Sequence, residues 1–154
     1  MRIYNDYDYI FCDIDDTIIY GIWTDIMRHT WAVLRNNAFS DFLMFNQNLF
    51  NIFKVNERLR FILNRFKGKL YFITARKEHK ATEELLHKII SRDFELISLA
   101  TDNPAEDKIN FIKSLVQKTD KVCVFDDAKD IRWNAIRNGY DAFDPVVMIE
   151  GLKI

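Results

Sequence analysis

Acidic residues stand directly after two apolar runs of the chain. Asp13 and Asp15 follow the run at residues 9–12, and a second acidic cluster begins at Asp126, after another apolar run. In extended backbone, residues two apart point to the same side, so the carboxylates of Asp13 and Asp15 can lie close together. Carboxylates crowded in this way favour the binding of a cation.

Residues with complementary chemistry follow or precede other apolar runs. Thr74 and Arg76 stand at the end of the run at residues 69–74, and Lys108 is predicted in the first turn of the helix before residues 121–125. A hydroxyl can donate to an anionic oxygen, and a lysine or an arginine can neutralise it. The carboxylates near the ends of the runs are Asp13, Asp15, Asp16, Asp126, Asp127 and Asp130.

Short apolar runs alternate with helical patterns along the chain. The runs at residues 9–12, 69–74, 96–100, 121–125 and 141–143 predict strands. Apolar residues with helical spacing lie between the runs. The third of these helical patterns, from Leu59 to Phe66, is predicted to stop at Gly68. This alternation predicts an α/β fold, a three-layer Rossmann-like sandwich with a mostly parallel sheet of about five strands.

The predicted sheet brings the polar residues together. Ligands of open α/β sheets bind beyond the carboxyl ends of the strands, where these side chains would converge. Aspartate and threonine are also common there as helix caps and turn residues, which is as good an explanation for any single position. Six crowded carboxylates would repel one another, however, and a bound cation would relieve that repulsion. An all-oxygen ligand set without Cys or His favours Mg²⁺ over zinc.

Composition narrows the class of protein. The chain has 154 residues, 49% of them hydrophobic, and a formal net charge of −1. That length predicts a single domain, and the apolar content excludes a mainly disordered chain. Cys12 and Cys123 lie within apolar runs, as expected for small core residues in a reducing compartment. With no apolar stretch of membrane-spanning length and no signal-peptide pattern, we expect a cytoplasmic protein.

Residues 18–66 form an insert after the first predicted strand. Helical spacing of apolar residues predicts two helices there, which would make a small cap; the second face ends at Phe53. Residues 21–66 contain six basic and three acidic residues, a net charge of +3 that suits an anionic substrate. Trp23 and Trp31 could stack a nucleobase, but their place on an apolar helical face favours core packing.

The ordered residues Asp13-x-Asp15-x-Thr17, Thr74, Lys108 and Asp126…Asp130 resemble the four motifs of the haloacid dehalogenase-like superfamily. The resemblance covers residues 9–143. It implies that Asp13 is a nucleophile that forms an aspartyl-phosphate, and that Asp15 is the general acid and base. It also implies that Thr74 and Lys108 bind the phosphoryl oxygens.

The same resemblance implies an Mg²⁺ site. Asp13, the Asp15 carbonyl and Asp126 would bind the ion, with Asp130 orienting Lys108 or a metal-bound water. Asp126-Asp127 stands where many members have Gly-Asp, so Asp127 is an alternative ligand; the spacing to Asp130 favours Asp126. Members with an aspartate at the place of Asp15 are phosphatases, which argues against carbon–halogen chemistry.

The substrate class stays open at this point. Thr74-Ala75-Arg76 and the Asp-Asp pair resemble the phosphatase half of bacteriophage-type polynucleotide kinase-phosphatases. Arg76 could fork onto a phosphate or simply pair with solvent or Glu78. We therefore expect an Mg²⁺-dependent phosphomonoesterase acting on a nucleic-acid 3′-phosphate or a nucleotide. The alternatives are a phosphatase for a small metabolite such as a sugar phosphate, and a non-catalytic binding protein that keeps the fold.

Overall fold

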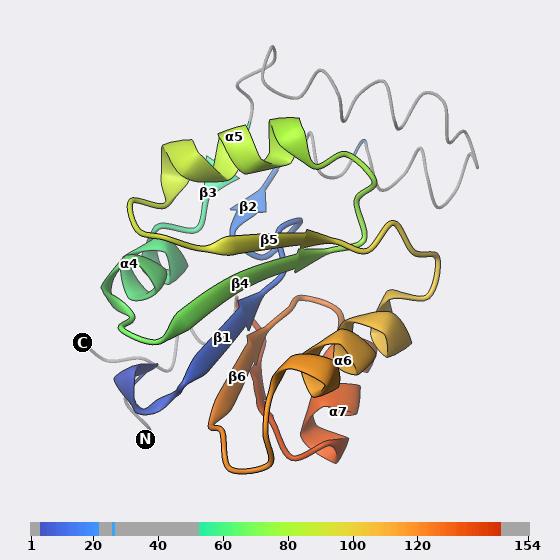
Figure 1. The fold of residues 1–154 in the computed structure, drawn as a ribbon. Helices are drawn as coiled ribbons and strands as arrows, with labels where there is room; N and C mark the ends of the chain where they lie inside the picture. The colour runs from blue at the N-terminus through green and yellow to red at the C-terminus, as the bar shows by residue number, and fades with distance from the viewer. Residues whose placement is uncertain (1–3, 22–25, 27–52, 146–154) are drawn as a thin grey trace.

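A parallel sheet forms the centre of the molecule in the computed structural model, which describes residues 4–21, 26 and 53–145 (Figure 1). Among these residues, five strands pair in the order β5-β4-β1-β6-β7. Their bounds are β1 Tyr9–Cys12, β4 Lys69–Thr74, β5 Glu95–Ser98, β6 Val122–Phe125 and β7 Asp141–Phe143. Every neighbouring pair is parallel, so the predicted α/β sandwich with a parallel sheet is confirmed.

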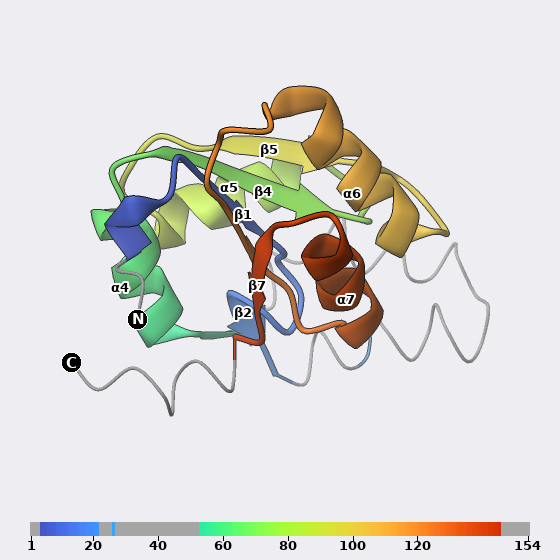
Figure 2. The ribbon, with the colours of Figure 1, turned by 90° about the horizontal axis from the view of Figure 1, so that it is seen from below.

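Helices cover both faces of the sheet. They are α4 Glu57–Arg65, α5 Lys80–Ile89, α6 Pro104–Leu115 and α7 Lys129–Arg137, and a short 3₁₀ turn, η1 Tyr4–Asp6, precedes β1. Figure 2 shows α4 and α5 on one side of the sheet and α6 and α7 on the other. The strands are nearly continuous apolar runs because both of their faces are buried.

Two hydrophobic clusters fill the spaces between the layers. On one face, Ile10, Phe72 and Phe125 pack with apolar residues of α4 and α5. On the other face, Phe11 and Val124 pack with apolar residues of α6 and α7. The alternation of Ile10 and Phe11 between the two clusters follows from the two-residue period of a strand. Side chains therefore pack against both faces of the central strands, and this packing holds the carboxyl ends of the strands in place.

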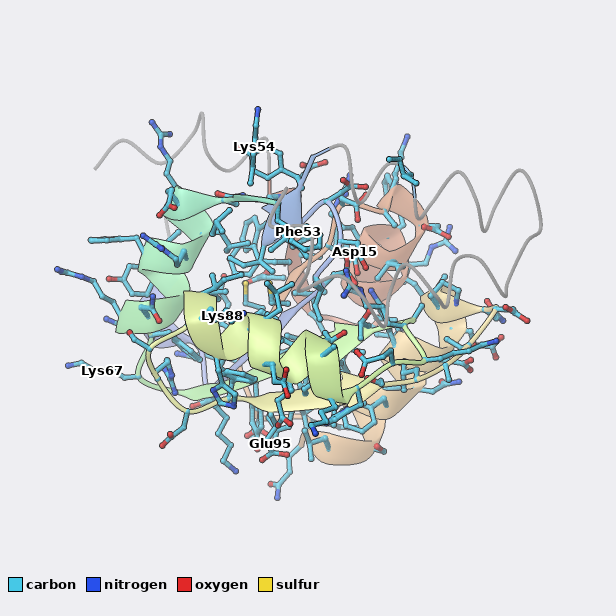
Figure 3. The ribbon with its side chains drawn as sticks, turned by 90° about the horizontal axis from the view of Figure 1, so that it is seen from above. Asp15, Phe53, Lys54, Lys67, Lys88 and Glu95 are labelled. Atoms are coloured by element: carbon cyan, nitrogen blue, oxygen red, sulfur yellow. The ribbon has the colours of Figure 1, made fainter. Side chains whose placement is uncertain are left out.

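The structure describes the insert at its two ends and at Ile26, which is helical. β2 Ile19–Tyr20 pairs antiparallel with β3 Lys54–Val55, so the ends of the insert meet beside the sheet. Apart from Ile26, the first helix predicted within the insert lies outside the described residues, as do both tryptophans and all of the second predicted helix except Phe53. Phe53, predicted on the second helical face, directly precedes β3 and is not helical. It packs against the core, whereas the neighbouring Lys54 points away from the molecule (Figure 3).

Gly68 has a different role from the predicted one. α4 ends at Arg65 with Phe66 as its C-cap, so Gly68 is not the residue that terminates the helix. A Cβ at Gly68 would lie 2.5 Å from the Asp8 carbonyl oxygen and closer still to the ring of Phe66. The glycine lets the chain pass close to Asp8 as it enters β4.

None of the described helices has the length and apolarity needed to cross a membrane.

Candidate active site

The chain turns sharply after β1 and presents its acidic residues at the sheet edge. The Ile14 carbonyl accepts hydrogen bonds from the N–H groups of Ile18 and Ile19, both at 3.1 Å. Asp16 adopts a φ of 57°, a left-handed conformation that aspartate tolerates, in agreement with its prediction as a turn residue. Ile14 is fully buried and anchors the turn, while Asp13 and Asp15 on either side of it stay partly exposed.

Lys108 joins the carboxylates that follow β1 and β6. Its Nζ lies 2.6 Å from Asp13 Oδ1 and 2.8 Å from Asp126 Oδ2. Lys108 is the fifth residue of α6, one position beyond the predicted first turn, and its side chain is buried. Asp126 Oδ1 also accepts the N–H of Ala128 at 3.0 Å. One ammonium thus holds two carboxylates that come from sequence positions more than a hundred residues apart.

Burial and crowding shift the protonation of this group. Despite its burial, Lys108 has a raised pKa, because Asp13 and Asp126 favour its charged form. Burial, together with the charges of Asp126 and Asp15, raises the pKa of Asp13 to about 8, and Lys108 only partly opposes this. Lys108 is therefore firmly charged, but it does not fully compensate the carboxylates around it.

A third carboxylate completes a candidate metal centre. Carboxylate oxygens of Asp13, Asp126 and Asp127 all lie within 4.8 Å of one another. Burial and the charges of Asp126 and Asp16 raise the pKa of Asp127 to about 6. Among the described residues, no side chain donates a hydrogen bond to the Asp127 carboxylate. A set of carboxylate oxygens fits Mg²⁺, and Asp127 presents the more open of the two candidate ligands after β6.

Arg76 binds Asp15 instead of lying in solvent or beside Glu78 alone. Its Nη2 lies 2.5 Å from Asp15 Oδ1 and its Nε lies 2.8 Å from Asp15 Oδ2, a bidentate pair. The Arg76 side chain is 3% exposed and that of Asp15 is 33% exposed, so the guanidinium lies behind the carboxylate. Thr74, also buried, accepts the backbone N–H of Arg76 at 3.1 Å, and its hydroxyl proton is left for another acceptor.

Two residues differ from the sequence-based interpretation. Asp130 is exposed, its Oδ1 accepts the N–H of the adjacent Ile131, and it is not part of the carboxylate cluster. Thr82 was not singled out from the sequence, yet it is fully buried and its Oγ1 accepts a hydrogen bond from Arg76 at 3.2 Å. In the sequence, the only feature that could have pointed to Thr82 is its place in the first turn of the helix that follows Arg76.

Comparisons of the chain with models of protein families, with curated proteins and with solved structures found no match. A functional conclusion therefore depends on the motifs in the sequence and on the geometry of these side chains.

Proposed function

We propose that the protein is an Mg²⁺-dependent phosphomonoesterase that works through an aspartyl-phosphate on Asp13. The observation that supports this most is the placement of the Asp13 carboxylate. It is bound to the Lys108 ammonium at 2.6 Å, lies beside the carboxylates of Asp126 and Asp127, and is followed two residues later by Asp15. Side chains suited to act as a nucleophile, a cation for phosphoryl oxygens, metal ligands and an acid–base residue thus lie close together, which supports the proposal.

The reaction would proceed in two steps. In the first, an Asp13 oxygen attacks phosphorus, the bond from phosphorus to the alcohol oxygen breaks, and protonated Asp15 donates its proton to the departing oxygen. In the second, Asp15 accepts a proton from water as the water oxygen attacks the aspartyl-phosphate. Inorganic phosphate leaves, Asp13 is restored as a carboxylate, and Asp15 is again protonated.

Other residues would neutralise charge and orient the phosphate. Lys108 is placed to stabilise the phosphoryl oxygens, because its ammonium already lies against Asp13. Thr74 can donate its hydroxyl proton to a phosphate oxygen. Mg²⁺ bound by Asp13 with Asp126 or Asp127 would add positive charge where negative charge develops.

Two substrate classes remain in competition. The Thr-x-Arg motif and the basic residues at 21–66 support a nucleic-acid 3′-phosphate or a nucleotide. The bidentate pairing of Arg76 with Asp15 weakens that case, because the same guanidinium is less available for a second phosphate. This pairing favours the alternative, a small phosphate ester such as a sugar phosphate.

A substrate panel tests both parts of the proposal. Hydrolysis of p-nitrophenyl phosphate should require Mg²⁺ and stop with chelator; no activity on any phosphate ester would refute the phosphatase assignment. For a nucleic-acid substrate, turnover of a 3′-phosphorylated oligonucleotide should fall steeply with salt, whereas turnover of p-nitrophenyl phosphate should not. Equal salt dependence for both, with faster turnover of sugar phosphates, would favour the small metabolite.

A further inference from the structure

The Arg76 guanidinium is hydrogen-bonded to the first turn of α5 on the side away from Asp15. Its Nε and Nη2 bind Asp15, and its Nη1 donates to Thr82 Oγ1 at 3.2 Å. Thr82 is the third residue of α5 and is fully buried. A planar guanidinium bonded at both ends has little freedom to rotate, so the bond to Thr82 restrains the plane of the guanidinium that binds Asp15.

Glu78 fixes Thr82 in turn. Its carboxylate accepts the backbone N–H of Ala81 at 2.7 Å and that of Thr82 at 2.9 Å. It therefore caps the start of α5, where the formal N-cap residue, His79, makes no side-chain cap. The Thr82 hydroxyl also lies 3.2 Å from the Glu78 carbonyl and 3.3 Å from its carboxylate, so the hydroxyl proton points to Glu78 and a lone pair faces Arg76.

We infer that Thr82, oriented by Glu78, is a positioning residue that acts through Arg76 to aim the Asp15 carboxylate at the leaving group. This inference rests on the proposed function, since it assigns a supporting role within the same site. Its physical basis is a continuous series of hydrogen bonds that ends at a side chain open to the substrate. Arg76, Glu78 and Thr82 are all buried, whereas Asp15 is one-third exposed.

The leaving group gives a readout that distinguishes this role from a structural one. A poorly acidic alcohol needs a proton from Asp15 as the bond to phosphorus breaks, whereas p-nitrophenolate leaves readily without one. The quantity to measure is kcat/KM, because it reports the steps up to the formation of the aspartyl-phosphate and not its later hydrolysis. Misplacing Asp15 should therefore lower kcat/KM for an alkyl phosphate far more than for p-nitrophenyl phosphate.

The test compares Thr82→Val, which keeps the shape but loses the hydroxyl, with Thr82→Ser, which keeps the hydroxyl. The alkyl substrate is the sugar phosphate or the 3′-nucleotide, whichever the wild type hydrolyses faster. Thr82→Val should lower kcat/KM for it roughly tenfold, and for p-nitrophenyl phosphate less than about threefold. Thr82→Ser should stay within about threefold of wild type on both substrates. Ala81→Gly is the matched control: it weakens the same helix turn without removing a side-chain contact to Arg76, and should leave the ratio of the two kcat/KM values unchanged.

The outcomes separate this inference from the proposed function. Suppose that the wild-type protein is active and that Thr82→Val loses activity equally on both substrates, or loses none. Either result overturns the positioning role and leaves the phosphatase proposal intact. The positioning role is also overturned if Thr82→Ser fails to restore activity while its melting temperature matches wild type. Wild-type protein that hydrolyses neither substrate overturns the proposed function and this inference with it.

Discussion

Two buried ion-pair groups lie at the same edge of the sheet and differ in their charge balance. Around Lys108, one ammonium faces Asp13 and Asp126, with the Asp127 carboxylate beside them. Around Arg76, the guanidinium pairs in bidentate fashion with the Asp15 carboxylate, and the buried Glu78 carboxylate acts on it as well. The first group is short of positive charge, as the raised pKa values of Asp13 and Asp127 show. In the second group, Asp15 is bound by Arg76, and Glu78 is bound by backbone N–H groups of α5.

This difference is what the proposed function would require of the two groups. Burying carboxylates without enough positive charge is costly, and the raised pKa values of Asp13 and Asp127 express that cost. A divalent cation and a phosphoryl group bring new charges and contacts to the first group. The second group continues into α5 through the hydrogen bond from Arg76 to Thr82. Under the proposed function, the first group would bind ligands and the second would position the Asp15 side chain.

Replacing Asp13 with Asn should have the largest effect. The amide keeps the shape of the side chain but is not a nucleophile, so we expect turnover of p-nitrophenyl phosphate to fall at least about a thousandfold, or about 4 kcal/mol in the barrier. The fold should remain, and the metal-free protein should melt no lower than wild type because one crowded charge is gone. Asp93→Asn, at an exposed site, is the control and should be fully active. A loss of less than tenfold would show that Asp13 is not the nucleophile.

Removing the cation from each group tests the charge comparison directly. Lys108→Met leaves Asp13 and Asp126 facing each other in a buried site, and breaking a buried pair in this way typically costs about 3–5 kcal/mol. Arg76→Met leaves Asp15, which is one-third exposed and can turn to water, so its cost should be smaller. Denaturant unfolding of both variants without metal at pH 7.5 measures the difference. An equal or larger loss in Arg76→Met would mean that the two groups do not differ as described.

Adding Mg²⁺ should compensate the first group and stabilise the protein. A ligand specific for the native state contributes about 2.7 kcal/mol at a hundred times its dissociation constant. Asp127→Asn should weaken the Mg²⁺-dependent rise in melting temperature, whereas Asp130→Asn should not, because Asp130 lies outside the cluster. Asp126→Asn distinguishes the two candidate ligands after β6. If Mg²⁺ leaves the melting temperature of wild type unchanged, the metal-site proposal is wrong.

The sheet and its polar edge could be predicted because both depend on local patterns. β1, β4 and β7 have the predicted bounds, since each is a short run of residues bounded by turn or helix signals. The two-residue strands β2 and β3 have no such pattern, since their pairing depends on where the ends of the insert meet. Gly68 has the sequence context of a helix stop, but its real constraint is the approach of Asp8, which is distant along the chain.

The partners of the long charged side chains were the least predictable part of the site. Residue type and position show that Arg76 and Lys108 reach the sheet edge. They do not show that Arg76 would fork onto Asp15, or that Lys108 would bind two carboxylates at once. Such choices depend on burial and on competing acceptors from other elements. For the same reason Thr82 could not be predicted, since its importance lies only in its contact with Arg76.

The smallest expected effect is a pH dependence of the metal-free protein. The pKa of Asp127 is about 6 in the folded chain and near 3.8 in the unfolded chain, so the folded state binds more protons between these values. Stability therefore rises as the pH falls through 6, and the penalty is fully present above it. Asp127→Asn removes this penalty, so it should melt above wild type at pH 7 by at most a few degrees. The gap should narrow steadily as the pH falls from 6 and close only below about pH 4, whereas the effect of Asp93→Asn should not change over this range. The same advantage for Asp127→Asn at both ends of this range would mean that the Asp127 carboxylate is not strained by its neighbours. The group around Lys108 would then have no shortage of positive charge at this position, and the case for a cation there would lose its electrostatic basis.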